Sequence, residues 1–151
     1  MTDNRHPTVS HDFASSLGLL VEQEGWLPRM AGRILGILLD SEEPLTQAQL
    51  AEVSGASIAT VSTMTRQLAE KQLIERVAAQ SERALYYRAR PDIWAAMEEE
   101  SLRSVRRYIA IVDGGLADDP GNARLAAMRK YFALVEERCL HVLTELQHPT
   151  E

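Results

Sequence analysis

Apolar residues recur every three or four positions over most of the chain, which is the period of an amphipathic helix. The first such stretch predicts a helix over residues 9–24, and the second predicts a helix over residues 28–40. Gly32 and Gly36 lie four residues apart on the second helix, so another backbone could approach closely there. Residues 1–10 carry no comparable pattern, and we expect them to form a flexible tail.

Two further helices are marked by capping residues. Thr46 is followed three residues later by Gln49, a capping-box pattern in which the two side chains satisfy free backbone donors at the start of a helix. Gly55 suits the end of that helix because glycine adopts a positive φ without strain. Ser57 then caps a fourth helix. The apolar stripe of this fourth helix consists of Val61, Met64, Thr65 and Leu68.

The spacing of small and apolar residues in these two helices predicts a helix-turn-helix. Ala51 lies where the helices cross, Gly55 follows four residues later at the turn, and Val61 follows six residues after that. Residues 73–77 and 85–89 then predict two short strands joined by a polar hairpin. The predicted fold class is therefore mainly α (α+β), with a winged helix-turn-helix.

Helical periodicity returns after the second strand. A long helix is expected to start at Pro91, and the glycine-containing segments 113–115 and 118–121 are expected to break it. A last helix is predicted over residues 122–146.

The terminal helices carry more apolar residues than one small domain needs. We expect a single domain over residues 11–147, in which 28–92 form the winged helix-turn-helix and 11–25 and 93–147 form dimerisation helices. The alternative is that these helices pack only within the monomer. The apolar residues concerned are Phe13, Leu17, Leu20, Val21, Tyr131, Leu134, Val135, Leu140 and Leu143.

The composition predicts an aliphatic core, and the charge is distributed unevenly along the chain. Hydrophobic residues make up 45% of the chain but aromatic residues only 5%. The net charge of −6 is unfavourable for binding phosphates, but residues 57–90 alone carry +3, between acidic flanks of −5 and −4. A basic segment between acidic arms favours a local contact with nucleic acid, although chance fluctuation would also produce it.

Three stretches, residues 27–39, 43–51 and 55–62, resemble the MarR family of bacterial regulators. The chain looks closest to the branch typified by the glycine-betaine synthesis repressor, the GbsR-like branch. In that branch a Tyr-Tyr strand precedes an Asp-x-Trp helix, and this chain has Tyr86-Tyr87 and Asp92-Ile-Trp94. The resemblance implies a homodimeric transcription factor, often a repressor relieved by a small ligand.

The outer face of the fourth helix is the candidate DNA-reading surface. Its side chains are mostly short, and several carry hydroxyls that can donate to or accept from base edges in the major groove. Arg66 can reach a guanine edge or a phosphate. The alternative is that Ser57 only caps the helix and that Thr60 and Thr63 are merely solvated. The candidate contacts on this helix are Ser57, Thr60, Ser62, Thr63 and Arg66.

Arg83, near the tip of the predicted hairpin, is the candidate wing contact to the minor groove or a phosphate, as the family resemblance also implies. Glu82 beside it departs from a purely basic wing and can orient Arg83 through a salt bridge.

Arg29 and Arg33 lie four apart on one face of the second helix. They could contact phosphate or stabilise the dimer. The alternative is local pairing with nearby acidic residues, namely Glu22, Glu24 and Asp40.

One helix-turn-helix makes few contacts, so two copies on successive major-groove faces, about 34 Å apart, predict an inverted-repeat operator on double-stranded DNA. A small-molecule effector would fit between the DNA-binding part and the dimerisation helices. Trp26 and Trp94 are the candidates for lining its pocket, and plain core packing is the alternative.

Nothing in the sequence supports catalysis. No His, Cys and acidic residues share metal-ligand spacing, and no phosphate-binding glycine loop or nucleophile elbow is present, so we expect no enzyme, metal or cofactor. A lone cysteine, Cys139, is expected to be a small buried hydrophobe, with redox sensing as the alternative. No apolar run approaches the ~20 residues that span a bilayer, and no signal sequence begins the chain, so we expect a cytoplasmic protein.

Two functions remain open at this point. The first is a homodimeric, sequence-specific DNA-binding transcriptional regulator. The second is a winged-helix module for protein–protein interaction that does not bind DNA.

Overall fold

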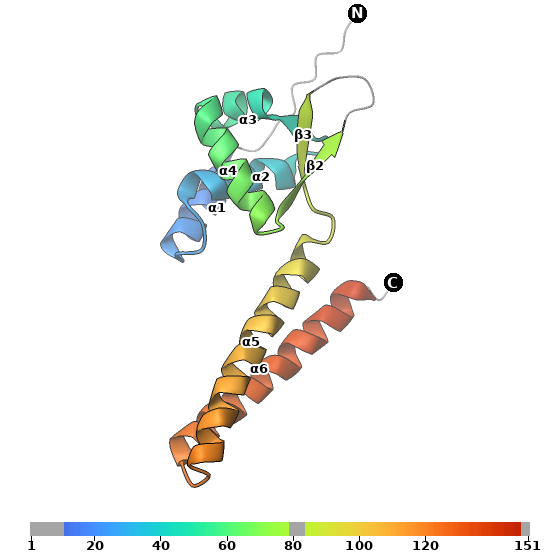
Figure 1. The fold of residues 1–151 in the computed structure, drawn as a ribbon. Helices are drawn as coiled ribbons and strands as arrows, with labels where there is room; N and C mark the ends of the chain where they lie inside the picture. Colours follow the sequence, from blue (N-terminus) through green and yellow to red (C-terminus); the bar gives the residue numbers. More distant parts are fainter. Residues whose placement is uncertain (1–10, 79–83, 149–151) are drawn as a thin grey trace, which may run out of the picture. The chain divides into compact units, whose positions relative to one another are not determined.

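The computed structural model describes residues 11–78 and 84–148, so the expected tail over residues 1–10 lies outside it. The chain divides between Ile93 and Trp94 into two compact units (Figure 1). The helices and strands of the first unit are α1 (His11–Gln23), α2 (Arg29–Asp40), β1 (Leu45–Thr46), α3 (Gln47–Ser54), α4 (Ile58–Glu70), β2 (Ile74–Ala78) and β3 (Leu85–Ala89). The second unit is a hairpin of α5 (Ile93–Asp118) and α6 (Ala123–Gln147). The mainly helical fold with a small antiparallel sheet is confirmed.

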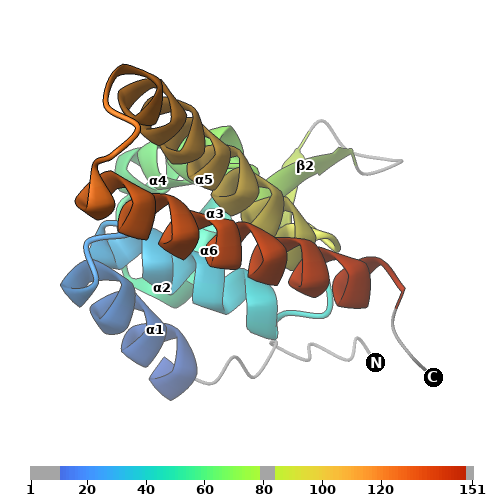
Figure 2. The same ribbon diagram turned by 90° about the horizontal axis from the view of Figure 1, so that it is seen from below.

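Glycines bring α1 and α2 into close contact, and the two helices lie side by side in Figures 1 and 2. A Cβ added at Gly36 would lie 2.8 Å from the Cα of Ala14, and one added at Gly18 would lie 2.6 Å from the carbonyl oxygen of Arg29. A Cβ at Gly32 would collide with the side chain of Val21. The close approach expected at Gly32 and Gly36 is therefore confirmed, and α1 supplies the second backbone.

Alanine at Gly36 is expected to lower the free energy of unfolding by about 1–3 kcal/mol, because neither helix backbone can move aside without losing packing. The matched control is Gly114→Ala in α5, where an added Cβ would meet no heavy atom within 4 Å. Removing the backbone freedom of that glycine should instead stabilise the protein by about 0.5–1 kcal/mol. Urea unfolding followed by circular dichroism measures both, and changes of the same sign at the two positions would contradict this packing.

The core of the first unit is aliphatic, as the composition predicts. Helix α2 packs against α1, α3, α4 and β3, and most of its residues are buried. The side chains with at most 2% exposure in this unit include Ile34, Leu35, Ile37, Leu50, Val61, Leu68, Leu73 and Ile74. Helix α2 is therefore the support on which the helix-turn-helix rests.

The sheet has three antiparallel strands in the order β1-β3-β2. The two predicted strands correspond to β2 and β3, but the short β1 was not predicted. In β1, Leu45 pairs with Tyr87 and Thr46 pairs with Tyr86. A strand of two residues is too short to show an alternating pattern, so the sequence predicts only the hairpin.

The break expected at residues 113–115 is wrong, because α5 continues to Asp118. Gly115 lies where a Cβ would come within 3.0 Å of Leu125, so a small residue suits this approach of α6. Asp113 accepts a hydrogen bond of 2.7 Å from Arg129 on α6. Packing and pairing against α6 therefore outweigh the low helix propensity of glycine. The predicted break at 118–121 does separate the two helices.

The hairpin of α5 and α6 encloses its own small core, formed by Leu102, Val105, Cys139 and Leu143. Arg106 and Glu136 form an additional ion pair of 2.8 Å between the two helices. Among residues 11–78 and 84–148, no helix is both long and apolar enough to cross a membrane.

Candidate nucleic-acid interface

The helix-turn-helix joint is built by the predicted residues. The capping box is present, because Thr46 accepts from the backbone of Gln49 at 3.2 Å and the Gln49 side chain accepts from Thr46 at 2.9 Å. Gly55 ends α3 with φ of 74°, in the left-handed region that glycine adopts readily. Val61 is fully buried inside α4. The angle between α3 and α4 is therefore fixed by local hydrogen bonds, one glycine and apolar packing.

The first turn of α4 is held by hydroxyls. Ser57 is the N-cap, and its side chain accepts from the backbone of Thr60 at 3.1 Å. The hydroxyls of Ser57 and Thr60 also lie 2.9 Å apart in a hydrogen bond. Capping uses part of the bonding capacity of Ser57, and either hydroxyl can donate the bond between them, so the pair together keeps one hydroxyl hydrogen and two lone pairs for an outside partner.

The remaining candidate side chains of α4 lie on its accessible side. Arg66 is exposed, while Thr60, Ser62 and Thr63 are half-buried. The Thr63 hydroxyl donates to the carbonyl of Ala59 at 3.1 Å. The opposite side of α4 buries Val61, Thr65 and Leu68 against the core, as the sequence predicts, and leaves Met64 half-buried. The structure thus gathers the five predicted positions along the free side and first turn of one helix.

Ile58 is an accessible residue of this helix that sequence reasoning missed. It occupies the first position of α4, directly after the cap, and 58% of it is exposed. An isoleucine in a helical segment ordinarily indicates core, so the sequence offered no signal beyond its place next to Ser57.

The basic residues of the middle segment are not equally available. Arg88 forms an ion pair of 2.6 Å with Glu75 across the β2–β3 pair. Arg90 binds both carboxylate oxygens of Asp92, at 2.9 and 2.7 Å, and holds the pKa of Asp92 below its usual value. Neither arginine is therefore a first choice for phosphate.

Three other cations of this segment are better placed. Arg66, Lys71 and Arg76 are exposed, and within residues 11–78 and 84–148 none of them pairs with a carboxylate. Arg76 lies 6.0 Å from the ring centroid of Tyr87, which orients its guanidinium without neutralising it. Arg83, with Glu82 beside it, lies outside the described residues.

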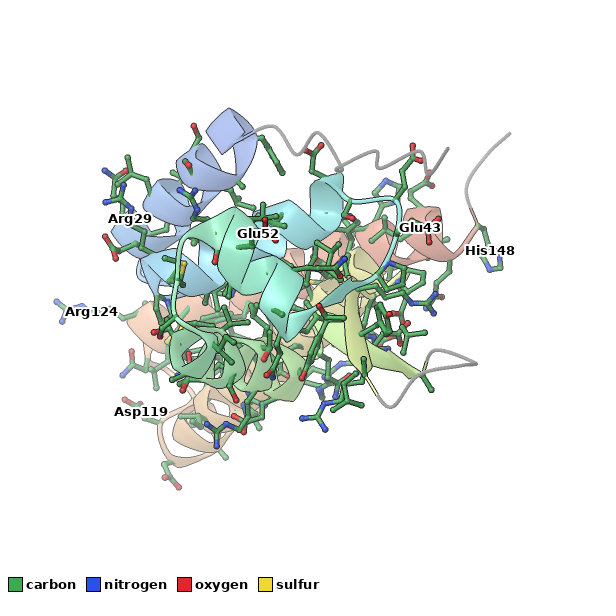
Figure 3. The ribbon with its side chains drawn as sticks, turned by 90° about the horizontal axis from the view of Figure 1, so that it is seen from above. Arg29, Glu43, Glu52, Asp119, Arg124 and His148 are labelled. Carbon is green, nitrogen blue, oxygen red and sulfur yellow. The ribbon has the colours of Figure 1, made fainter. Side chains whose placement is uncertain are left out.

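Arg29 and Arg33 line a cavity between α1 and α2, together with Ser15 and Met30, whose volume is about 300 Å³. Arg33 donates to the Ser15 hydroxyl at 2.8 Å, while its Nε atom is buried with no partner among the described residues. Figure 3 shows Arg29 extending outward from the start of α2. Within the described part of the chain, neither arginine pairs with an acidic residue, so the expected alternative of local pairing is not found.

The two tryptophans fall in different units. Trp26 follows α1 and is 37% exposed, whereas Trp94 lies in the first turn of α5 and is 50% exposed. Neither is a buried core residue, so plain core packing does not account for them.

Cys139 is a buried residue of the α5–α6 hairpin, with 1% exposure. Burial raises the pKa of its thiol, and Glu98 nearby adds to the effect. A thiol with a raised pKa forms little reactive thiolate, which favours the packing role over redox sensing. In the described ranges no three His, Cys, Asp or Glu side chains come together as metal ligands.

The comparison with known proteins agrees with this geometry. The MarR family model matches residues 33–83, which include α2 from its second turn, the helix-turn-helix and β2. The HTH-type transcriptional regulator MmpR5 of Mycobacterium tuberculosis is 34% identical over 131 residues, covering 83% of this chain and 79% of that protein. A crystal structure described as a transcriptional regulator superposes with a TM-score of 0.70 at 32% identity, covering 90% of this chain and 96% of the other.

A capped, solvent-accessible second helix in a winged helix-turn-helix is the arrangement that DNA-binding transcription regulators use. The chain belongs to the MarR family, and it is a DNA-binding transcriptional regulator. Proteins of this family are transcriptional regulators that bind DNA and dimerise.

Proposed function

We propose that two copies of this chain bind an inverted-repeat operator and repress transcription until a small ligand releases them. The observation that carries the DNA-reading part is the accessible side of α4, where Ser57, Thr60, Ser62, Thr63 and Arg66 gather and Arg66 has no acidic partner in the described residues. Short side chains let a helix lie deep in the major groove, and their hydroxyls can bond to base edges. Arg83 adds the proposed wing contact. We propose no catalytic activity.

Different parts of the chain are proposed to bind DNA and to form the dimer. Residues 28–92 would read DNA, and residues 11–25 and 93–147 would join the two copies. Exposed apolar side chains on both sets of helices support the second part, among them Phe13, Leu20, Tyr131, Leu134 and Leu140. We also assign the chain to the GbsR-like branch, on its Tyr86-Tyr87 strand and Asp92-Ile-Trp94 helix start.

Arg66→Ala should weaken operator binding about tenfold and reduce the slope of log affinity against log salt by about 1, because one phosphate or guanine contact is lost. The operator is first obtained by selection from random DNA, beginning with DNA upstream of the chain's own gene. Arg124→Ala is the matched control, because Arg124 extends into solvent from the other unit (Figure 3). Absence of any specific binding at low salt would favour the alternative, a module that binds only other proteins.

The effector site has two candidates. The first is the two tryptophans that the sequence suggests, Trp26 of the first unit and Trp94 of the second, each partly exposed. The second is the 300 Å³ cavity that Ser15, Arg29, Met30 and Arg33 line. The unpaired Nε of Arg33 favours the cavity, because a buried charged donor without a partner is costly and a carboxylate would satisfy it. Met30 can contact the apolar part of such an anion.

Benzoate should bind the protein at millimolar concentration or better, and Arg33→Gln should weaken that binding by about tenfold or more through loss of charged hydrogen bonds. Titration calorimetry compares benzoate with benzamide, which has a similar shape but no charge. Equal binding of the two compounds, or benzoate binding that Arg33→Gln leaves intact, would exclude the cavity as an anion site.

A further inference from the structure

Ile58 is the most exposed large apolar side chain of the first unit among its described residues, at 58%. It lies three residues before Val61, at the N-terminal end of the stripe of α4, and it is exposed whereas Val61, Thr65 and Leu68 are buried. A side chain exposed to this extent adds little to the core, so Ile58 is available for contact with a molecule outside the chain.

The place of Ile58 on α4 is well defined. It is the first helical residue after Ser57, whose hydrogen bonds to Thr60 fix the first turn. Ser62 lies four residues further along, on the same side of the helix. In helix-turn-helix proteins the N-terminal residues of the second helix contact base edges in the major groove. Ile58 is therefore in the turn that approaches the bases first.

The groups displayed in the major groove indicate which base Ile58 would contact. Isoleucine neither donates nor accepts a hydrogen bond, so it cannot read the polar edges of guanine, cytosine or adenine. The C5-methyl of thymine is the apolar group that the major groove displays. Contact between this methyl and Ile58 would remove apolar surface of both from water.

We propose that Ile58 is a specificity-determining residue that reads the methyl group of one thymine in each operator half-site. This inference rests on the proposed entry of α4 into the major groove. Helix α4 would then carry two kinds of contact. The hydroxyls and Arg66 read polar edges, and Ile58 supplies the apolar contact.

The test replaces thymines of the selected operator one at a time by deoxyuridine, which lacks only the methyl group. The native protein should lose about three- to fivefold in affinity at one thymine per half-site, the effect expected for one buried methyl. Ile58→Ala should bind the unmodified operator more weakly and show no further loss at that thymine. Ile58→Val, which keeps a branched side chain, should retain part of the sensitivity.

Leu85→Ala is the matched control, because Leu85 is an aliphatic residue of the same unit with 52% exposure that lies on β3 and not on α4. It should keep the full penalty at the thymine that Ile58 reads. Unchanged penalties at every thymine in Ile58→Ala would overturn the proposal for Ile58 while leaving DNA binding intact. Lack of operator binding by the native protein would overturn the proposed function itself, so the two failures are distinct.

Discussion

Aspartate at both Ile111 and Leu134 is expected to separate the proposed dimer into monomers and to reduce operator affinity about a thousandfold, toward non-specific binding. Ile111 on α5 is 72% exposed and Leu134 on α6 is 58% exposed. Neither side chain supports the hairpin from inside, so the substitutions should leave its folding nearly unchanged. In a dimer that buries them, each carboxylate would lose its hydration without gaining a partner, which is costly. A monomer then engages only one half-site.

Light scattering at micromolar concentration measures the mass, and circular dichroism verifies that the helices remain. Lys130→Glu is the control, because it changes the charge of α6 by more than either aspartate but replaces an exposed polar residue. The control should stay dimeric. A double aspartate variant with the native mass would show that the copies associate through another surface, and a monomeric native protein would refute dimerisation outright.

Features of the fold that depend on neighbouring residues were predictable from the sequence. Thr46 with Gln49, Gly55 and Ser57 mark helix ends through hydrogen bonds that span three or four residues, and the structure has each of them as expected. The apolar stripe of α4 was equally clear, because its period is a property of one helix.

Features that depend on distant residues were not predictable. Strand β1 forms only because Leu45 and Thr46 meet Tyr87 and Tyr86 some forty residues later. The continuity of α5 through Gly115 depends on its contact with α6.

The candidate site shows the same division between local and distant effects. The sequence places Ser57, Thr60, Thr63 and Arg66 on α4, and the structure has them there. Charge counting overstated the basic segment, because Arg90 is paired with Asp92, which lies just outside the counted residues 57–90. Ile58 was not predictable because hydrophobicity alone does not show which apolar residue is exposed. Exposure is a property of the packed chain, so it appears only in the structure.

Tyr87→Ala is expected to lower the free energy of unfolding of the first unit by about 3–5 kcal/mol, the usual cost of removing a buried aromatic ring. Tyr87 is 1% exposed on the central strand β3, between Leu45 of β1 and Arg76 of β2. Its hydroxyl accepts a hydrogen bond of 3.1 Å from Gln47 of α3. One side chain thus connects all three strands to the helix-turn-helix, and its loss should also loosen the wing.

Two further variants separate the ring from the hydroxyl. Tyr87→Phe keeps the ring and loses only the hydrogen bond with Gln47, so it should cost about 0.5–1.5 kcal/mol. Leu85→Ala removes an exposed side chain from the same strand and should change stability by no more than about 0.5 kcal/mol. The free energy of unfolding, measured in urea, should therefore be much lower for Tyr87→Ala than for Tyr87→Phe. If the two tyrosine variants unfold alike, the ring does not hold the wing to α3, and the wing must be positioned by β2 alone.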